Sequence, residues 1–107
     1  MRGLYTSGDW YVKEGSEDPF VEAWRELADW TVSNFSGCTF AKLLSDESDS
    51  SHFLSFSPWR DDGAVAAWRK HPGFQQRVGH LREVLESFTP HTMHVAAEVG
   101  PPTPDPW

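Results

Sequence analysis

The sequence predicts an α+β domain in which four antiparallel strands form one sheet and helices cover one of its faces. Segments in which apolar and polar residues alternate flank segments in which apolar residues recur every three or four positions, in the order β-α-β-β-α-β. The chain has 107 residues, of which 38% are hydrophobic, so it can form one core but not two. Right-handed crossovers then place the helices on the same side of the sheet.

The first strand and the first helix lie in the N-terminal third. Residues 4–13 alternate as a half-buried strand does, and a turn at residues 14–16 ends this pattern. Asp18 followed by Pro19 is typical of a helix start, and the apolar residues that follow repeat at helical spacing. We therefore predict a helix over residues 18–33.

The middle of the chain predicts a hairpin. Residues 38–44 and 52–57 favour strands, and the Ser- and Asp-rich residues 45–51 favour the polar loop between them. Pro58 should lie at the end of the third strand, because a proline in its interior would remove a backbone donor.

The C-terminal half predicts two helices and a last strand. A short helix is expected over residues 61–70 and a longer one over 72–88, with apolar residues at spacings of three and four. Residues 92–99 alternate as a strand. These elements predict a ferredoxin-like fold, with a domain over residues 1–99 and a proline-rich tail over 100–107 that forms an extended arm.

Charge and cysteine content exclude some classes of partner. The net charge is −7 and no basic run occurs, so a nucleic acid would be repelled. No apolar segment has the ~18 residues of a membrane-spanning helix. Cys38 is the only cysteine, and the N-terminal residues lack the apolar core of a signal peptide. We therefore expect a cytoplasmic protein that binds neither nucleic acid nor membrane.

The sheet face away from the helices carries too many apolar side chains to be left in water. Strand alternation assigns Tyr11, Phe53, Ser55 and His94 to this outer face, together with Phe40 or Leu43, depending on the register. The simplest way to cover it is a second copy packed sheet against sheet about a two-fold axis. We expect a homodimer, with the tail lying across the partner.

Residues 8–99 resemble the antibiotic biosynthesis monooxygenase family of the dimeric α+β barrel superfamily. The resemblance rests on Gly15-Ser16-Glu17 leading to Phe20 and Trp24, on the Gly37 turn, and on Trp59-Arg60-Asp61 followed by Trp68, His71-Pro72 and Phe74. It implies a dimeric ferredoxin-like fold. It also implies a small monooxygenase of one of two kinds, which degrade haem or oxidise aromatic polyketides without a cofactor.

The two kinds differ in the residues they require. In the haem-degrading group, a Trp is followed ten residues later by the His that ligates iron, and the first strand carries an Asn. Here Trp68 matches the Trp, but the tenth residue is Val78, the nearest helical histidine is His80, and the first strand has no Asn. The resemblance therefore favours cofactor-independent chemistry, with haem binding through His80 as an alternative.

An aromatic pocket between helices and sheet is the predicted site. We expect Trp68, Phe74, Trp24 and Phe56 to contact a small aromatic or polycyclic molecule, although aromatic side chains at these positions can equally well fill the core.

The candidate bases are His80, His94 and Tyr11. A His and a phenol on neighbouring strands could deprotonate a phenolic substrate. The alternatives are an exposed helical His80 and a polar contact between copies for His94 and Tyr11. The alternative function is that of a non-catalytic ligand-binding or interaction protein, which keeps the fold but has lost the Asn and the haem-ligating His of the family.

Three helical arginines could neutralise a carboxylate or enolate, although arginines on exposed helix positions are also ordinary: Arg69, Arg77 and Arg82. His71 precedes Pro72 at a helix break, where a capping role is expected rather than catalysis.

Overall fold

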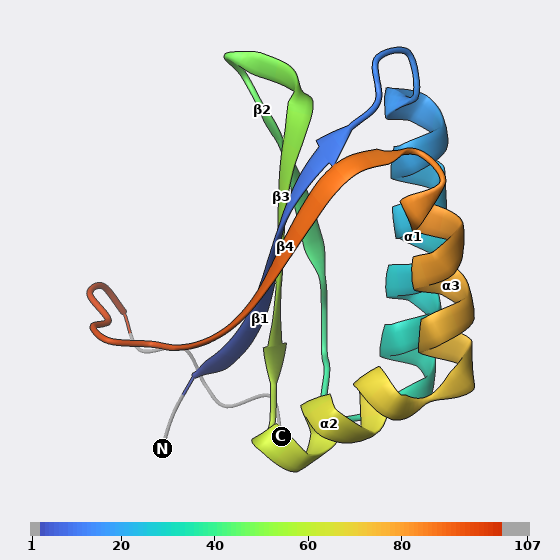
Figure 1. The fold of residues 1–107 in the computed structure, drawn as a ribbon. Helices are drawn as coiled ribbons and strands as arrows, with labels where there is room; N and C mark the ends of the chain where they lie inside the picture. Colours follow the sequence, from blue (N-terminus) through green and yellow to red (C-terminus); the bar gives the residue numbers. More distant parts are fainter. Residues whose placement is uncertain (1–2, 102–107) are drawn as a thin grey trace.

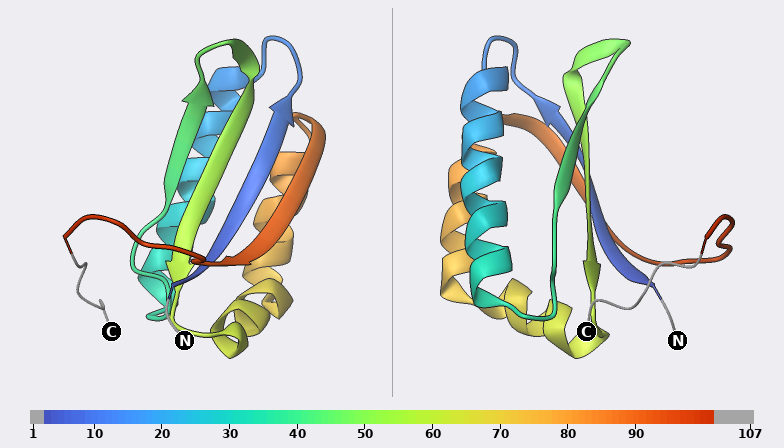
Figure 2. Two further views of the ribbon diagram at one scale, coloured as in Figure 1. Left: turned by 90° about the vertical axis from the view of Figure 1, so that its left-hand side faces the viewer. Right: turned by 180° about the vertical axis from the view of Figure 1, so that it is seen from behind.

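The computed structural model describes residues 3–101 and shows one antiparallel sheet with three helices on one face (Figure 1). The strand order is β2-β3-β1-β4, so the two central strands are β3 and β1. Figure 2 shows the helices forming a single layer and leaving the opposite face of the sheet bare. The elements in chain order are β1 (Leu4–Val12), α1 (Glu17–Asn34), β2 (Lys42–Asp46), β3 (Asp49–Trp59), α2 (Asp62–Lys70), α3 (Pro72–Arg82) and β4 (Leu85–His94).

The predicted α+β class and ferredoxin-like order are confirmed. The expected strand over 4–13 and the helices over 18–33 and 61–70 agree with β1, α1 and α2 to within a residue at each end. The Asp61 side chain accepts a hydrogen bond from the Ala64 backbone N–H at 2.8 Å and caps α2. None of the helices within residues 3–101 is long and apolar enough to span a membrane.

The hairpin in the middle of the chain is tighter than predicted. The loop expected over residues 45–51 is mostly paired strand, and the turn falls at residues 47–48. The Asp46 and Asp49 side chains each accept hydrogen bonds from the residue two positions on, Ser48 and Ser51. These local bonds let a polar sequence turn sharply, so β3 begins at Asp49 and β2 begins at Lys42 rather than Cys38.

The helix predicted over 72–88 begins at the right residue but is too long, and the last strand predicted over 92–99 is placed too late in the chain. Helix α3 ends at Arg82, and β4 runs from Leu85 to His94 along the free edge of β1. Phe88 stacks on the Trp10 ring with centroids 4.0 Å apart. Leu85 and Phe88 fit a helical stripe as well as a strand, so pairing with β1 overrides the local pattern. Pro90 is tolerated because β4 is an edge strand.

The inner face of the sheet packs against the helices in two separate apolar clusters. At one end, Trp10 and Phe53 pack with α1 and α3, and at the other end Leu4 and Trp59 pack with α2. These strand residues are all at most 6% exposed. The core is therefore divided along the strands, and the stretch between the clusters is where the sheet and helices meet least closely.

Of the residues predicted for the outer face, Tyr11 lies there, but Phe53, Ser55 and His94 do not. Phe53 and Ser55 point toward the helices, because Phe53 pairs with Trp10 and Ser55 with Gly8. His94 pairs with Leu4, also an inner-face residue. A strand alternates with period two, so an assignment that is off by one residue exchanges its faces. Exposed apolar residues on the actual outer face include Tyr11, Leu44, Leu54 and Met93.

A cluster of charged groups crosses the outer face beside Tyr11. His52 Nδ1 lies 2.8 Å from Asp46 Oδ2, and His52 Nε2 lies 2.8 Å from Asp9 Oδ1. The Tyr11 ring stacks on the His52 ring with centroids 4.6 Å apart. The hydrogen bond to Asp46, and then that to Asp9, raises the pKa of His52 above 6.5. The same histidine is the main cause that lowers the pKa of Asp46 to about 2.

The His52 cluster predicts a stability maximum in weak acid. Because the pKa of His52 is raised on folding, protonated His52 contributes its full stabilisation below pH 6.5. This contribution is lost as the pH rises through the pKa of His52 in the folded state. The lowered pKa of Asp46 contributes above pH 3.8 and is lost as the pH falls toward 2. The difference in unfolding free energy between wild type and His52→Gln should therefore peak between about pH 4 and 6.5. Denaturant unfolding across this range measures it, and a difference that does not vary with pH contradicts the assignment.

Candidate functional site

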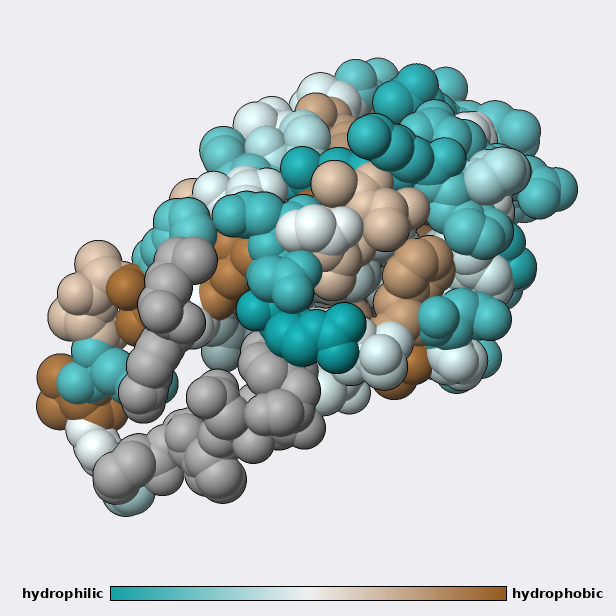
Figure 3. Space-filling model, turned by 90° about the horizontal axis from the view of Figure 1, so that it is seen from below, coloured by the Kyte–Doolittle hydropathy of each residue, from teal (hydrophilic) through white to brown (hydrophobic). Residues whose placement is uncertain are grey.

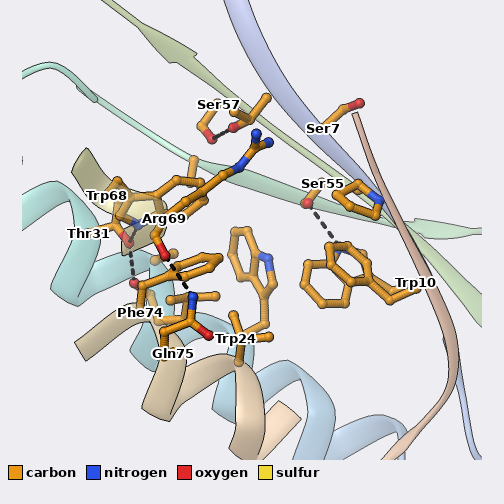
Figure 4. A pocket seen from close by; sticks show the side chains of 18 of the residues that line it. Ser7, Trp10, Trp24, Thr31, Ser55, Ser57, Trp68, Arg69, Phe74 and Gln75 are labelled. Carbon is orange, nitrogen blue, oxygen red and sulfur yellow. Dashed lines mark hydrogen bonds between the residues drawn. The ribbon is translucent and has the colours of Figure 1, made fainter. Parts of the chain in front are cut away.

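A pocket lies between the inner face of the sheet and the helices, in the gap between the two apolar clusters (Figure 4). Its volume is about 270 Å³, just below the range of small-molecule sites, roughly 300–1,000 Å³. Strands β1, β3 and β4 and all three helices contribute to it. The residues that line it include Thr6, Gly8, Trp10, Trp24, Ala28, Thr31, Ser55, Ser57, Trp68, Arg69, Phe74, Gln75, Arg82 and Phe88.

Small residues in the middle of two strands create this space. Thr6 pairs with Ser57 and Gly8 pairs with Ser55, and all four lie on the inner face. Larger residues flank these positions on each strand and form the two apolar clusters. A Cβ at Gly8 would lie 2.8 Å from Phe88 Cε1 and 3.0 Å from Trp10 Nε1. Any other residue there would displace the rings that bound the pocket.

Aromatic rings form the walls. On the helix side, the Trp68 and Phe74 ring centroids are 4.4 Å apart, and Trp59 lies behind Trp68 at 4.8 Å. On the sheet side, the stacked Trp10 and Phe88 close the opposite end. Such walls suit a flat apolar molecule, because aromatic faces pack against one another in offset or tilted contacts.

Hydrogen bonds fix the orientation of two indoles that line the pocket. Trp68 Nε1 donates to Thr31 Oγ1 at 2.9 Å, and Thr31 in turn donates to the Leu27 carbonyl at 2.8 Å. Trp10 Nε1 donates to Ser55 Oγ at 2.9 Å. Buried indole N–H groups need such partners. Both rings are therefore held in place before any ligand binds.

Trp24 is different, because its indole nitrogen makes no hydrogen bond to the other residues drawn in Figure 4. The ring comes from α1, is half-buried, and stands between the Phe74 side and the Trp10 side of the pocket. Its N–H is thus a donor available to a ligand.

Two arginines bring the only charges into the lining. Arg69 extends from α2 toward the strands in Figure 4, and its Nη2 donates to Thr92 Oγ1 of β4 at 3.1 Å. Arg82 lies in the last turn of α3. The pocket as described has no Asp, Glu, His, Lys, Tyr or Cys in its lining. It can therefore bind, orient and stabilise negative charge, but it contains no side chain that titrates near neutral pH.

Cys38 lies close to this region but does not supply a nucleophile. The thiol is 2% exposed and packs with Leu4, Trp59 and Val65. Burial raises the pKa of Cys38 to about 11, so the thiol stays protonated, as expected for a cysteine that packs as a small apolar residue.

The structure places three of the four predicted ligand contacts in the pocket. Trp68, Phe74 and Trp24 all line it. Phe56 does not, because it pairs with Ser7 on the outer face and its ring contacts Tyr5 and Phe40. Phe53, Leu54 and Phe56 are all apolar, so the sequence pattern alone did not distinguish the two faces of β3.

None of the three candidate bases reaches the pocket. His80 is exposed on α3, beside Glu26, Gln76 and Arg77. Tyr11 pairs with Ser87 on the outer face and His94 pairs with Leu4. The predicted juxtaposition of Tyr11 and His94 is therefore wrong, since they lie on opposite faces and about 23 Å apart along the strands.

A haem does not fit the residues that are present. The lining of the pocket contains no His, Cys, Tyr or Met to serve as an axial ligand. His80, the only candidate that the sequence suggested, lines a separate surface depression with Glu26, Gln76 and Arg77. Within residues 3–101, no group of three His, Cys, Asp or Glu side chains could hold a metal ion.

The remaining helical candidates have structural roles. Arg77 lies over the Trp30 ring at 4.6 Å and near Glu26, away from the pocket. His71 Nδ1 accepts a hydrogen bond from the Gly73 backbone N–H at 2.9 Å, so it caps α3 as expected.

The residues that sequence reasoning missed are the small ones on the strands. Their signal is the pair of motifs Thr6-Ser7-Gly8 and Ser55-Phe56-Ser57, which interrupt two otherwise apolar inner faces.

Solved structures share this fold at low sequence identity. SnoaB, a cofactor-independent oxygenase from Streptomyces nogalater crystallised as a mutant, superposes with a TM-score of 0.83 and 15% identity, covering 92% of this chain and 98% of that one. A protein described as an antibiotic biosynthesis monooxygenase gives 0.76 and 21%, over 88% and 99%. A conserved protein of unknown function from Bacteroides thetaiotaomicron gives 0.78 and 20%, over 87% and 97%.

Sequence comparison identifies the family more directly. No curated protein sequence matches this chain. The family model for antibiotic biosynthesis monooxygenases, however, matches residues 6–80. This span is well over half of the chain and includes most of the residues that line the pocket. The chain therefore belongs to the antibiotic biosynthesis monooxygenase family.

Proposed function

We propose that the protein is a small monooxygenase that binds a flat aromatic substrate in the pocket and oxidises it with dioxygen without a cofactor. The observation that carries the proposal is a preformed pocket, walled by Trp10, Trp24, Trp68, Phe74 and Phe88, in a member of a monooxygenase family. The similarity of the fold to SnoaB, a cofactor-independent oxygenase, supports it.

The chemistry requires only that the substrate reduce dioxygen itself. In an anthrone, for example, the ring CH₂ loses one proton and the resulting carbanion supplies electrons to O₂. A C–O bond forms at that carbon, the second hydrogen leaves as a proton, and the O–O bond breaks with release of water. One oxygen atom stays on the ring as a carbonyl, so anthrone and O₂ give anthraquinone and water. The protein contributes desolvation, positioning and stabilisation of the anion.

The lining favours a second candidate as well, a ligand-binding protein without catalysis. The pocket offers two arginines and several hydroxyls but no general base. General acid–base catalysis typically contributes 10²–10⁴-fold in rate, and a site without it must rely on a substrate that ionises readily. Binding of an aromatic ligand without oxygen uptake would identify this second function.

Oxygen consumption with anthrone tests the first function. We expect protein-dependent uptake of O₂ and formation of anthraquinone. Trp24→Leu should lower kcat/KM at least ~10-fold, or ~1.4 kcal/mol, because it removes one wall of the pocket. Trp30→Leu is the matched control, since Trp30 lies on the same helix but contacts Phe35 and His71 outside the pocket. Equal losses in both variants would contradict a role for the pocket.

We also propose that the outer face of the sheet is covered by a second copy of the chain. Leu54 is 37% exposed, Leu44 47% and Met93 50%, and all three lie on this face. The segment after β4 adds to this surface, since Val99 is 97% exposed. Figure 3 shows this segment standing away from the body as an apolar arm, while the helix side is mostly hydrophilic. An isologous sheet-to-sheet contact would bury these groups in both copies.

Sedimentation tests the dimer. We expect wild type at micromolar concentration to have twice the 12.1 kDa chain mass. Leu54→Lys should shift it toward the monomer, because the interface would have to bury an unpaired charge. Val32→Lys is the control, since Val32 is also 37% exposed but lies on α1. A monomeric wild type, or equal effects of the two lysines, would refute this arrangement.

A further inference from the structure

The charge of the pocket is opposite to that of the chain. The protein has 16 acidic residues against nine lysines and arginines, for a net charge of −7. None of the acidic residues that the structure describes lines the pocket, whereas Arg69 and Arg82 both do. The long-range field therefore repels anions, and the local lining attracts them.

Among the arginines of residues 3–101, these two are the ones without a carboxylate partner. Within residues 3–101, the arginine ion pairs join Arg25 to Glu22, Arg60 to Asp61 and Arg77 to Glu26. Arg69 instead hydrogen-bonds the neutral Thr92 hydroxyl, and this bond holds it between α2 and β4 at the pocket. An arginine fork held in place without a counter-ion is suited to bind a carboxylate or another planar anion.

The absence of a base in the lining has a second consequence. A side chain that removes a proton from the ligand is not available there, so an acidic ligand must be ionised on entry or lose its proton to water. Two cations favour the ionised form and lower the pKa of a bound acid, whereas the aromatic walls alone would raise it by desolvation.

We infer that the pocket selects flat aromatic ligands that carry an anionic group, with Arg69 and Arg82 as the charge partners and the rings as the apolar walls. This inference rests on the proposal that the pocket is the ligand site, and it narrows the ligand to aromatic carboxylates and ionised phenols. Trp24 Nε1, which no neighbour in the pocket occupies, is a third donor for the same group.

A matched pair of probes tests the inference. 2-Naphthoate and 2-naphthamide have the same ring system and nearly the same shape, but only the first is charged. Titration of each into the full chain, followed by quenching of tryptophan fluorescence, should give an affinity at least ~10-fold higher for naphthoate. The overall negative charge of the protein works against this preference, so a preference for the anion has to come from groups in the pocket.

Variants of the two arginines test whether these residues cause the preference for naphthoate over naphthamide. Arg69→Gln and Arg82→Gln, singly and together, should reduce the ratio of the two affinities toward one, because they weaken the binding of naphthoate more than that of naphthamide. Arg69→Lys and Arg82→Lys keep the positive charge and should therefore retain part of the preference for naphthoate. Arg25→Gln is the control, because Arg25 is exposed on α1 and pairs with Glu22. The exposed Arg82 provides a substitution with little risk to folding.

The outcomes separate this inference from the proposed function. Equal affinities of wild type for the two probes, or a preference that survives in the double Gln variant, would overturn the role of the arginines and leave the pocket as a neutral aromatic site. No binding of either probe would overturn both the inference and the proposed function.

Discussion

The site depends on a pattern of side-chain size along the two central strands. On the inner face, β1 and β3 carry small residues at Thr6, Gly8, Ser55 and Ser57. The pair Trp10 and Phe53 flanks them on one side, and the pair Leu4 and Trp59 on the other. The helices pack tightly where the large residues lie and cannot follow the sheet where the small ones lie. Protein interiors are otherwise close-packed, so the space that remains is a property of these four positions.

Hydroxyl groups at two of these positions also anchor indoles. Ser55 accepts a hydrogen bond from Trp10, and Thr6 accepts one from Trp59 at 3.0 Å. The same residues therefore leave the space open and orient the rings around it. The arginines from the helix ends then give this apolar space a positive side, which the composition of the whole chain conceals.

Much of the fold is predictable from the sequence, because its signals are local. The acidic first turn and the apolar stripe of α1 indicate a helix without reference to the rest of the chain. The region after Arg82 was not predictable in the same way, since Leu85 and Phe88 suit either a helix or a strand. Only the free edge of β1 decides between them, and that edge exists only once the sheet has formed.

The residues of the candidate site also divide into those that local sequence signals predict and those that they do not. Trp24, Trp68 and Phe74 could be identified because large aromatic residues on the apolar faces of helices must point toward the sheet. The positions of the candidate bases could not be predicted in this way. Whether His80, His94 and Tyr11 face the pocket depends on helix orientation and strand register, which their side-chain chemistry does not reveal. The prediction that Phe56 lies in the pocket was wrong for the same reason as the outer-face assignment. Strand β3 is apolar on both sides, so alternation does not fix its register.

The most direct test of the account fills the pocket and leaves the rest of the chain unchanged. Ala28 lies on α1 in the pocket lining, and Ala28→Phe would place a ring in the space that the small strand residues leave. We predict a variant with an unchanged circular dichroism spectrum and a Tm no lower than that of wild type, because it buries more apolar surface. Its binding of 2-naphthoate should be lost. A folded Ala28→Phe protein that binds this probe as tightly as wild type would show that the ligand site lies elsewhere.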